Sequence, residues 1–596
     1  MRVPQTSWRA VGLIVSLSAA GLAFAESSDN TFRPLGVAAW GISVIAFAVA
    51  LLDRPVHWRP ALARGEWLAL LAVLLIGAWF RFYQLDVNPR EMNSDHAEKL
   101  LDVHDVLEGR TAIFFERNTG REPFQFYWTA ALIHVSRLLP SAWSLAPDFM
   151  ALKIGTAVWG LLSLPAVYGL ARMLFGARAA MFAALFAAVA SWGVLAQRFG
   201  LRAGIHTTMA AWVLFWLVRA VRTNKRNDFL ALGLSLGLAL LGYIPARVLP
   251  LVIALFIGAR AAQLWVQRSS ELAQRLLMNA GVSLWLAGLV VLPLARYTLE
   301  RPHMVFYRVA TRLAEAEKPI EGNPLLIFAD NMWRALLMFH ITRDETWVTN
   351  LPDRPVLDPL LGALLVLGLV LVIGSSKWRR MGVLVVLAIA ILLLPSALSL
   401  AFPRENPSAI RTLGALPFVM TLCAVPLGWG LELTQRWRVA HLAAWLVVLG
   451  ISAAVVALNA QRVFVDYPAQ YCPRAQNASD IAQVMREALG RGVPRQNVWL
   501  VGYPHWVDHR AVGVWLGDIR FNNVAGASVG LTDAALVSLA PGGAVFVLHP
   551  ADAGSLSNLL ARFPQGRYRL FEGSQCDGRE FLVFEVSADE TAAQPH

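Results

Sequence analysis

The sequence contains few charged residues and few cysteines. Only 15% of its 596 residues are charged and 57% are hydrophobic, whereas about 25% of the residues of a soluble globular chain are usually charged. The 3 cysteines are too few for a disulfide scaffold. Apolar runs recur along the chain, many of them near the length of about 20 residues that a helix needs to cross a bilayer. These features exclude an ordinary soluble domain and indicate an α-helical polytopic membrane protein.

The positive net charge does not indicate a nucleic-acid partner. The formal charge is +12, but most basic residues lie in short loops between apolar runs, where membrane orientation alone would place them. We therefore expect membrane lipids, and no nucleic acid, among the partners.

The cysteines leave two alternatives open. Cys472 and Cys576 both lie in the polar C-terminal region, whereas Cys423 lies in an apolar run. If the C-terminal region is outside the cytoplasm, Cys472 and Cys576 could form one disulfide; otherwise they remain two thiols.

The apolar runs predict about 13 transmembrane helices. They cover residues 11–25, 35–52, 66–82, 150–172, 178–196, 204–221, 229–244, 248–265, 276–295, 357–375, 381–401, 412–431 and 439–459. The first run also resembles a cleavable signal peptide, because arginines precede it and Ala23-Phe24-Ala25 ends it. Both interpretations leave residue 26 outside, so the topology of the later helices is the same.

The basic residues predict which loops are cytoplasmic. Arg and Lys are concentrated in every second loop, as in cytoplasmic loops. The opposite, extracytoplasmic side then receives the segments 83–149 and 296–356 and everything after about residue 460. The stretch 123–139 is amphipathic, and we expect it in the membrane interface, because a crossing there would invert the charge bias. The expected location is the inner or plasma membrane.

Some arginines depart from this bias. They lie in short turns on the extracytoplasmic side, which should be poor in basic residues, and they are Arg198, Arg202, Arg247, Arg404 and Arg411. Guanidinium groups match phosphate geometry and stay charged when partly desolvated, so the set predicts a site for a membrane-embedded phosphate. The alternative for each arginine is contact with lipid headgroups or with acidic loop residues.

A carboxylate cluster lies on the same predicted side. Asp95 and Glu98 begin a stretch whose acidic residues recur every three or four positions, as on one face of an amphipathic helix. A helix N-terminus stabilises negative charge, and a carboxylate there could accept a proton from a nucleophile. The neighbouring His96 is expected to be a polar surface residue and not a metal ligand.

The order of several motifs resembles a known superfamily. An outer-loop aspartate precedes Gly109 and Arg121-Glu122-Pro123-Phe124, and the later segments are Arg198 to Arg202, Pro245 to Arg247, Arg343 to Pro352 and Glu405 to Arg411. This order resembles the GT-C glycosyltransferases, specifically the superfamily of protein O-mannosyltransferases and lipid A aminoarabinose transferases. The resemblance covers residues 66–465.

The resemblance implies a reaction. Enzymes of this superfamily take a sugar from a polyprenyl phosphate on the extracytoplasmic face and transfer it with inversion. It implies that Asp95 is the general base and that the outer-turn arginines hold the donor phosphate. Many relatives have an Asp-Glu pair where this chain has Asp95-His96, so the acceptor or second-carboxylate candidates are His96, Glu98, Arg121 and Glu122. The acceptor could be a protein, a lipid or a glycan.

The second outer loop and the cofactors are less defined. In the loop 296–356, Asp344, Trp347 and Asn350 are candidates, with Trp347 offering an apolar face for a sugar ring. No nucleotide-binding signature is present, which favours a lipid-linked donor. No strong metal-spacing motif is present either, although a divalent cation remains possible. A lipid-phosphate transporter or flippase and a non-catalytic scaffold remain alternatives to the enzyme.

The chain is expected to have three parts. Residues 1–65 are extra N-terminal spans, residues 66–465 are the glycosyltransferase core, and residues 466–596 are a small extracytoplasmic α/β domain. The last part alternates helical patterns at 479–490 and 552–562 with strand-like runs, which are 497–501, 544–548, 567–572 and 580–586.

Overall fold

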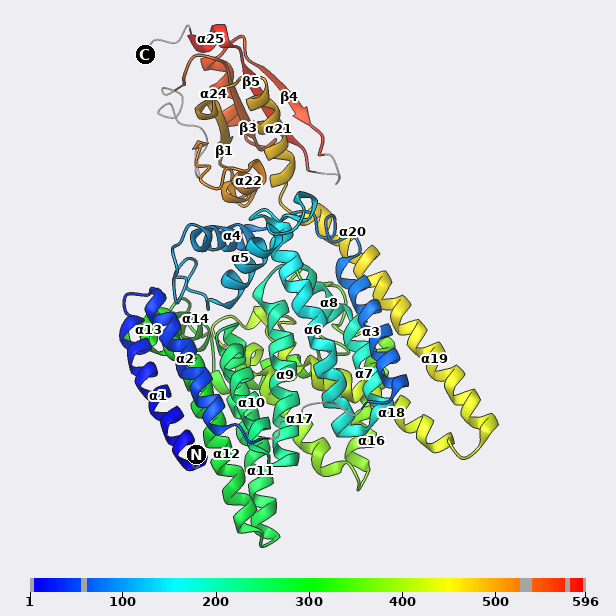
Figure 1. Ribbon diagram of the computed structural model, residues 1–596. Helices are drawn as coiled ribbons and strands as arrows, with labels where there is room; N and C mark the ends of the chain where they lie inside the picture. Colours follow the sequence, from blue (N-terminus) through cyan, green and yellow to red (C-terminus); the bar gives the residue numbers. More distant parts are fainter. Residues whose placement is uncertain (1–4, 55–61, 526–538, 574–578, 593–596) are drawn as a thin grey trace.

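The computed structural model (Figure 1) describes residues 5–54, 62–525, 539–573 and 579–592. It consists of a helix bundle, a thin layer of short helices on one end of the bundle, and a C-terminal α/β domain on that layer. The apolar runs and the polar C-terminal region of the sequence therefore correspond to separate layers.

The bundle is built from the apolar runs. Its helices are α1 (Gln5–Glu26), α2 (Pro34–Leu51), α3 (Arg64–Phe82), α6 (Phe149–Phe175), α7 (Ala177–Val189), α8 (Ser191–Arg198), α9 (Arg202–Thr223), α10 (Arg226–Leu240), η2 (Ile244–Val248), α11 (Leu249–Val266), α12 (Ser270–Val290), α13 (Leu292–Glu300), α16 (Pro359–Gly374), α17 (Arg379–Ala397), η4 (Leu413–Ala415), α18 (Leu416–Thr434) and α19 (Arg438–Gln461). Each of the 13 predicted spans coincides with one of these helices or with a bent pair of them.

Fewer helices qualify as membrane spans when helix length and apolar composition are both required. Among the described residues, nine helices are long and apolar enough to cross a membrane, and up to eleven are if each bent pair counts as one span. The remaining predicted spans correspond to α10 and α16, which have only 15 and 16 residues. The prediction of a polytopic helical membrane protein is confirmed.

Two of the spans are bent. α7 and α8 meet at 47°, and α12 and α13 meet at 66°. Pro293 stands at the start of α13, where its ring and missing N–H interrupt a continuous helix. The bend after α7 makes α8 a separate, fully buried helix. The chain then turns into α9 at Gly200, whose φ of +80° suits glycine and whose added Cβ would lie 3.1 Å from Leu152 Cβ.

Short helices cover one end of the bundle. They are α4 (Ser94–Leu107), α5 (Phe124–Ser136), η1 (Ser141–Trp143), α14 (Pro302–Leu313), α15 (Pro324–Leu337), η3 (Pro403–Glu405), η5 (Arg462–Asp466), α20 (Tyr467–Tyr471) and η6 (Cys472–Arg474). The Asn93 side chain caps α4 by accepting a hydrogen bond from the His96 N–H. α5 has 13 residues and does not count as a span among the described helices. α5 is thus not one of the spans, and the interfacial position of residues 123–139 stays a prediction.

The C-terminal domain is a mixed sheet with helices. Its elements are α21 (Ala478–Gly490), η7 (Arg495–Asn497), β1 (Val498–Val501), α22 (His509–Leu516), β2 (Val524–Ala525), β3 (Ala544–Leu548), α24 (Ala553–Arg562), β4 (Arg567–Phe571), β5 (Phe581–Val586) and α25 (Ala588–Ala592). The strand order is β2-β1-β3-β5-β4. β2, β1 and β3 are parallel, and β5 and β4 are antiparallel to their neighbours. The α/β prediction is confirmed, although the two-residue β2 and the short α22 were not predicted.

The C-terminal domain shares a core with the short-helix layer. Buried Ala97 and Leu100 of α4 belong to the same apolar cluster as Ile481 of α21 and Ala511 of α22. Cys472 is disulfide-bonded, but its expected partner Cys576 lies outside the described residues. The domain is therefore seated on α4, next to the carboxylates singled out in the sequence.

Candidate functional site

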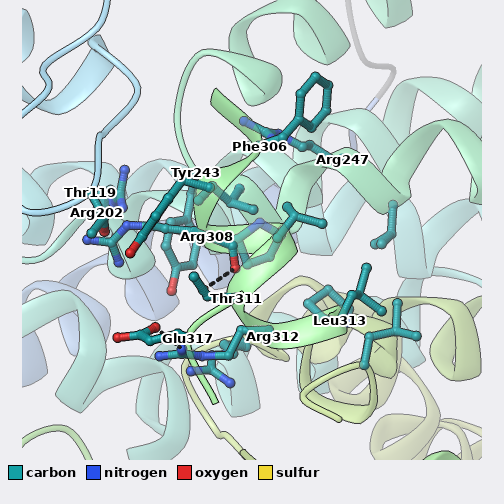
Figure 2. Close-up of a pocket in the computed structure, with 18 of the residues that line it drawn as sticks. Thr119, Arg202, Tyr243, Arg247, Phe306, Arg308, Thr311, Arg312, Leu313 and Glu317 are labelled. Atoms are coloured by element: carbon teal, nitrogen blue, oxygen red, sulfur yellow. Dashed lines mark hydrogen bonds and ion pairs between the residues drawn. The ribbon is translucent and has the colours of Figure 1, made fainter. Parts of the chain in front are cut away.

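A cavity of about 510 Å³ opens at the end of the bundle that carries the short helices. Seven segments far apart in the sequence line it: α4, the loop 108–123, the start of α9, the turn before α11, α14 with the residues that follow it, the end of α17, and the turn before α18. Its charged lining residues are Asp95, Arg202, Arg247, Arg308, Arg312, Glu317 and Arg411. Figure 2 shows Arg202, Arg308 and Arg312 gathered around the cavity. One aspartate thus shares a cavity with several arginines.

Asp95 lies among cations. Its Oδ1 is 3.5 Å from Lys99 Nζ and 3.6 Å from Arg121 Nη2, and its side chain is 48% exposed. The positive charge of Lys99, and to a smaller extent that of Arg121, holds the pKa of Asp95 well below its usual range. The opposing effect of burial is weaker. Asp95 is therefore an ionised carboxylate that faces the cavity.

Arg121 and Glu122 point in opposite directions. Phe115 and Arg121 form an antiparallel bridge, so the chain is extended here and successive side chains alternate. The buried Arg121 contacts Glu98 and lies 3.4 Å from Asp102 of α4. The buried Glu122 faces the arginines described next. One dipeptide thus connects the acidic helix to the basic cavity wall.

Glu122 holds two of the cavity arginines. Its Oε2 accepts a hydrogen bond from Arg202 Nη1 at 2.7 Å, and its Oε1 accepts one from Arg247 Nη2 at 3.2 Å. Arg411 pairs with Glu405, which also lies 3.3 Å from Arg312 Nη2. These four guanidinium groups are oriented, and partly neutralised, by carboxylates.

Arg308 differs from the other cavity arginines. No carboxylate lies within ion-pair distance of its guanidinium in the described part of the chain, and its Nη2 donates to the Asn118 carbonyl at 2.5 Å. Its buried Nε has no hydrogen-bond partner there. Burial, followed by the charges of Arg202 and Arg121, lowers the pKa of Arg308 to about 10, so it is still a cation at neutral pH. An anion entering the cavity would meet this charge without displacing a carboxylate.

The structure does not bring Arg198 and Arg404 to the cavity. Arg198 is buried, and its two terminal nitrogens donate to the carbonyls of Phe80, Tyr83, Gln84 and Asn88 at 2.9 to 3.1 Å. Arg198 thereby holds together the irregular chain that follows α3. Arg404 is exposed in η3, outside the cavity lining.

His96 is buried and fully engaged, unlike the surface residue expected from the sequence. Its Nδ1 accepts from the Asn93 N–H at 3.1 Å and its Nε2 donates to the Phe199 carbonyl at 2.6 Å. Burial lowers its pKa to about 3, which keeps this neutral tautomer. Because both ring nitrogens are hydrogen-bonded, the ring ties α4 to the α8–α9 turn.

Glu98 faces the C-terminal domain as well as Arg121. Its Oε1 accepts from Arg510 Nη1 at 2.9 Å. Burial alone would raise its pKa, but the hydrogen bond and charge of Arg121 more than offset this, and the pKa is lowered. Arg510 is oriented in turn by Asp508, which caps α22. Glu98 therefore joins the layer to the domain and does not line the cavity.

The second outer loop packs against α20. Asp344 is buried, with its oxygens accepting from the N–H groups of Thr346 and Ala409 at 2.9 and 2.7 Å, and burial raises its pKa. Asn350 is buried as well, and its carbonyl accepts from Gln470 at 3.2 Å. Trp347 lines a different cavity, beneath the C-terminal domain.

Arg308 and Arg312 were not among the predicted residues. They lie four apart on α14, inside the loop 296–356 that the charge bias placed on the extracytoplasmic side. The same signal that singled out the arginines of the short turns could have found them. However, α14 belongs to a long loop, and the charge bias is informative mainly in short loops.

No group of three or more His, Cys, Asp or Glu side chains in the described ranges could hold a metal ion. Asp95 is already neighboured by Lys99 and Arg121, whose charges oppose a bound cation. The residues present around this carboxylate fit an anionic ligand better than a divalent cation.

Comparison with solved structures identifies the fold. The chain resembles ArnT from Cupriavidus metallidurans in its apo state, with a TM-score of 0.54 and 15% identity over 89% of this chain and 99% of that one. It also resembles the same protein bound to undecaprenyl phosphate, with a TM-score of 0.53 and 15% identity over 90% of this chain and 100% of that one. The chain therefore has the GT-C fold.

A comparison with protein families finds a match to a family of transferases. Residues 145–287, from the start of α6 into α12, match the family of dolichyl-phosphate-mannose-protein mannosyltransferases. No curated protein matches the chain. Together, the fold and the family match over residues 145–287 confirm the resemblance found in the sequence, which is to glycosyltransferases of the GT-C superfamily.

Proposed function

We propose that the chain transfers a sugar from a polyprenyl-phosphate-linked donor to an extracytoplasmic acceptor, with inversion at the anomeric carbon. The donor phosphate lies against Arg308, and Asp95 receives the acceptor. The bundle within residues 66–465 is the catalytic part, and the short-helix layer faces away from the cytoplasm.

The observation that carries this proposal is the shared cavity. Asp95 and Arg308 both line it, and Arg308 has no carboxylate partner in the described residues. A phosphate carries the charge and the acceptor oxygens that a partly buried guanidinium binds best. The ArnT structure of the same fold was determined with undecaprenyl phosphate bound, which supports a lipid phosphate as the ligand.

The other arginines have a supporting role. Arg202 and Arg247 are held in place by Glu122, so their N–H groups are oriented before a ligand arrives. Donors that are fixed in advance stabilise developing charge without reorganising during the reaction. Arg312 and Arg411 line the same cavity and complete its positive wall.

The chemical step needs one attack and one departure. An acceptor O–H or N–H attacks the anomeric carbon from the face opposite the phosphate, so a bond to that carbon forms while the carbon–oxygen bond to the phosphate breaks. The electron pair of the broken bond leaves with the polyprenyl phosphate, and the acceptor's proton passes to Asp95. The arginines stabilise the charge on the leaving oxygen, so that oxygen needs no protonation.

The environment of Asp95 fits a late proton transfer. Its lowered pKa makes it a weak base, but also keeps it ionised at neutral pH. It can hold the acceptor by a hydrogen bond while bond formation makes the acceptor's proton more acidic. Proton transfer then becomes favourable after attack has begun.

Binding of undecaprenyl phosphate to the full-length protein in nanodiscs tests the proposal. Arg308→Gln should weaken this binding by about tenfold to a hundredfold, because one charge-assisted hydrogen bond is lost. Arg404→Gln is the matched control: it removes a charge from the same end of the bundle but outside the cavity, and its affinity should equal that of the wild type. Equal losses in both variants, or no loss in Arg308→Gln, would remove the cavity as the phosphate site.

A further inference from the structure

A second cavity of about 380 Å³ lies between the short-helix layer and the C-terminal domain. Asn93 and Trp347 contribute from the membrane part, and Trp506, His549 and Arg579 contribute from the C-terminal domain. Its volume is within the usual range of ligand pockets, about 300 to 1,000 Å³. The cavity exists only because the domain is seated on the layer.

Its position in the domain is one where ligands commonly bind. Residues 504–506 follow β1 and His549 follows β3, so the carboxyl ends of two parallel strands open into the cavity. Open α/β sheets bind their ligands in crevices at these ends. None of the cavity's described lining residues belongs to a strand, so no sheet edge is presented there to pair with an extended peptide.

The lining combines aromatic faces with polar groups. Trp347 packs against Tyr471 with ring centroids 5.1 Å apart, and Trp506 packs edge-on against His549 at 5.4 Å. Charged and amide side chains complete the wall, namely Arg474, Gln476, Asn477, Arg579 and Glu580. A sugar ring has C–H groups on its faces and hydroxyls around its edge. Aromatic rings cover the first, and amide, guanidinium and carboxylate groups hydrogen-bond the second.

Each of the two cavities is lined by a residue at the N-terminus of α4. Asn93 lines the second cavity and Asp95 lines the first. Asn93 and Asp95 are two positions apart in the chain, so their Cα atoms are at most about 7 Å from each other. The capping hydrogen bond from the His96 N–H to Asn93 Oδ1 fixes this stretch of chain. The second cavity and the carboxylate that lines the first are thus neighbours at one helix end.

We infer that the acceptor is a carbohydrate chain and that the second cavity binds it, with the terminal hydroxyl directed past Asn93 to Asp95. This inference rests on the proposed function, because it names the acceptor of that reaction. It gives the C-terminal domain a direct role in acceptor selection. The donor phosphate and the acceptor glycan then occupy different cavities on either side of one helix end.

Saturation-transfer NMR on the full-length protein in nanodiscs tests the inference. The probes are mannobiose, cellobiose and chitobiose, with the tripeptide Gly-Ser-Gly as a peptide probe. We expect at least one disaccharide to bind and Trp506→Ala to weaken that binding by about tenfold. Trp506→Phe, which keeps an aromatic face, should retain most of the affinity. The control Trp143→Ala removes an exposed tryptophan of η1, outside both cavities, and should change nothing.

A second variant guards against misfolding. Arg474 is exposed at the cavity rim, so Arg474→Gln should leave the fold intact and still weaken disaccharide binding. Undecaprenyl phosphate should bind equally to Trp506→Ala and to the wild type, so a failed donor site and a failed acceptor site give different results. Absence of disaccharide binding, binding of the tripeptide alone, or equal disaccharide affinity in the wild type, Trp506→Ala and Arg474→Gln would overturn the inference.

Discussion

The two cavities are neighbours, yet their linings differ in kind. The larger is walled by guanidinium groups, most of which are held by carboxylates. The smaller is walled by aromatic rings and mixed polar groups, and half of it belongs to the C-terminal domain. In the proposed reaction the first binds a phosphate, which is the same in every polyprenyl donor. The second binds the acceptor, so the C-terminal domain, and not the bundle, is where specificity for the acceptor would vary.

The largest expected effect separates chemistry from binding. Asp95→Asn removes the carboxylate that receives the acceptor's proton, and we expect sugar transfer to fall by about a thousandfold. Binding of undecaprenyl phosphate should be unchanged or tighter, because a negative charge leaves the arginine cavity. Transfer is measured as release of polyprenyl phosphate from a lipid-linked sugar. A correctly folded Asp95→Asn protein that still turns over would exclude Asp95 as the base.

A smaller effect is the pH dependence of the contact between the C-terminal domain and the short-helix layer. Glu91 is buried beneath α21 and accepts hydrogen bonds from Ser479, and burial raises its pKa to about 7. The folded state therefore keeps the proton up to about pH 7, whereas the unfolded chain loses it near its ordinary value of 4.5. Stability is lost as the pH rises between these values, by about 3 kcal/mol in total.

Limited proteolysis of the domain between pH 4.5 and 8 measures this effect. The wild type should become more susceptible as the pH rises, and Glu91→Gln should abolish the dependence because its side chain is always neutral. Glu108→Gln is the control, since Glu108 pairs with Arg520 of the domain in a more exposed setting. If Glu91→Gln kept the wild-type pH profile, Glu91 would not be the titrating group.

The smallest expected effect falls on the residue between the cavities. Asn93→Ala removes the N-terminal cap of α4 and should cost about 1 kcal/mol of stability, seen as a lower thermal midpoint. Since Asn93 and Asp95 share this helix end, affinities for undecaprenyl phosphate and for the disaccharide should both decrease slightly. A change in only one affinity would mean that the cavities are independent.

The sequence predicts the parts of this molecule that depend on local pattern. The apolar runs coincide with helices, and the strand-like runs 497–501 and 544–548 coincide with β1 and β3, because hydrophobic periodicity is a property of a single segment. β2 has only two residues and offers no period to detect. α10 and α16 were expected as spans but have only 15 and 16 residues, fewer than the roughly 20 that usually cross a bilayer.

The position of a charged side chain depends on distant segments and is harder to predict. Arg198 and Arg202 are four residues apart, yet one closes the chain after α3 and the other lines the cavity. What separates them is the irregular backbone at residues 83–88, whose carbonyls accept hydrogen bonds from Arg198. No feature of the sequence near Arg198 indicates those carbonyls.

The pairing of Arg121 with Phe115 across the turn 117–119 has a consequence for the length of this loop. Arg121 reaches α4 and Glu122 reaches Arg202 because consecutive side chains in extended chain face opposite ways. A change in loop length that shifted this pairing by one residue would exchange these directions and bring a cation to the arginines and an anion to the acidic helix. Homologues with this arrangement should therefore differ here by substitution and keep the number of residues constant.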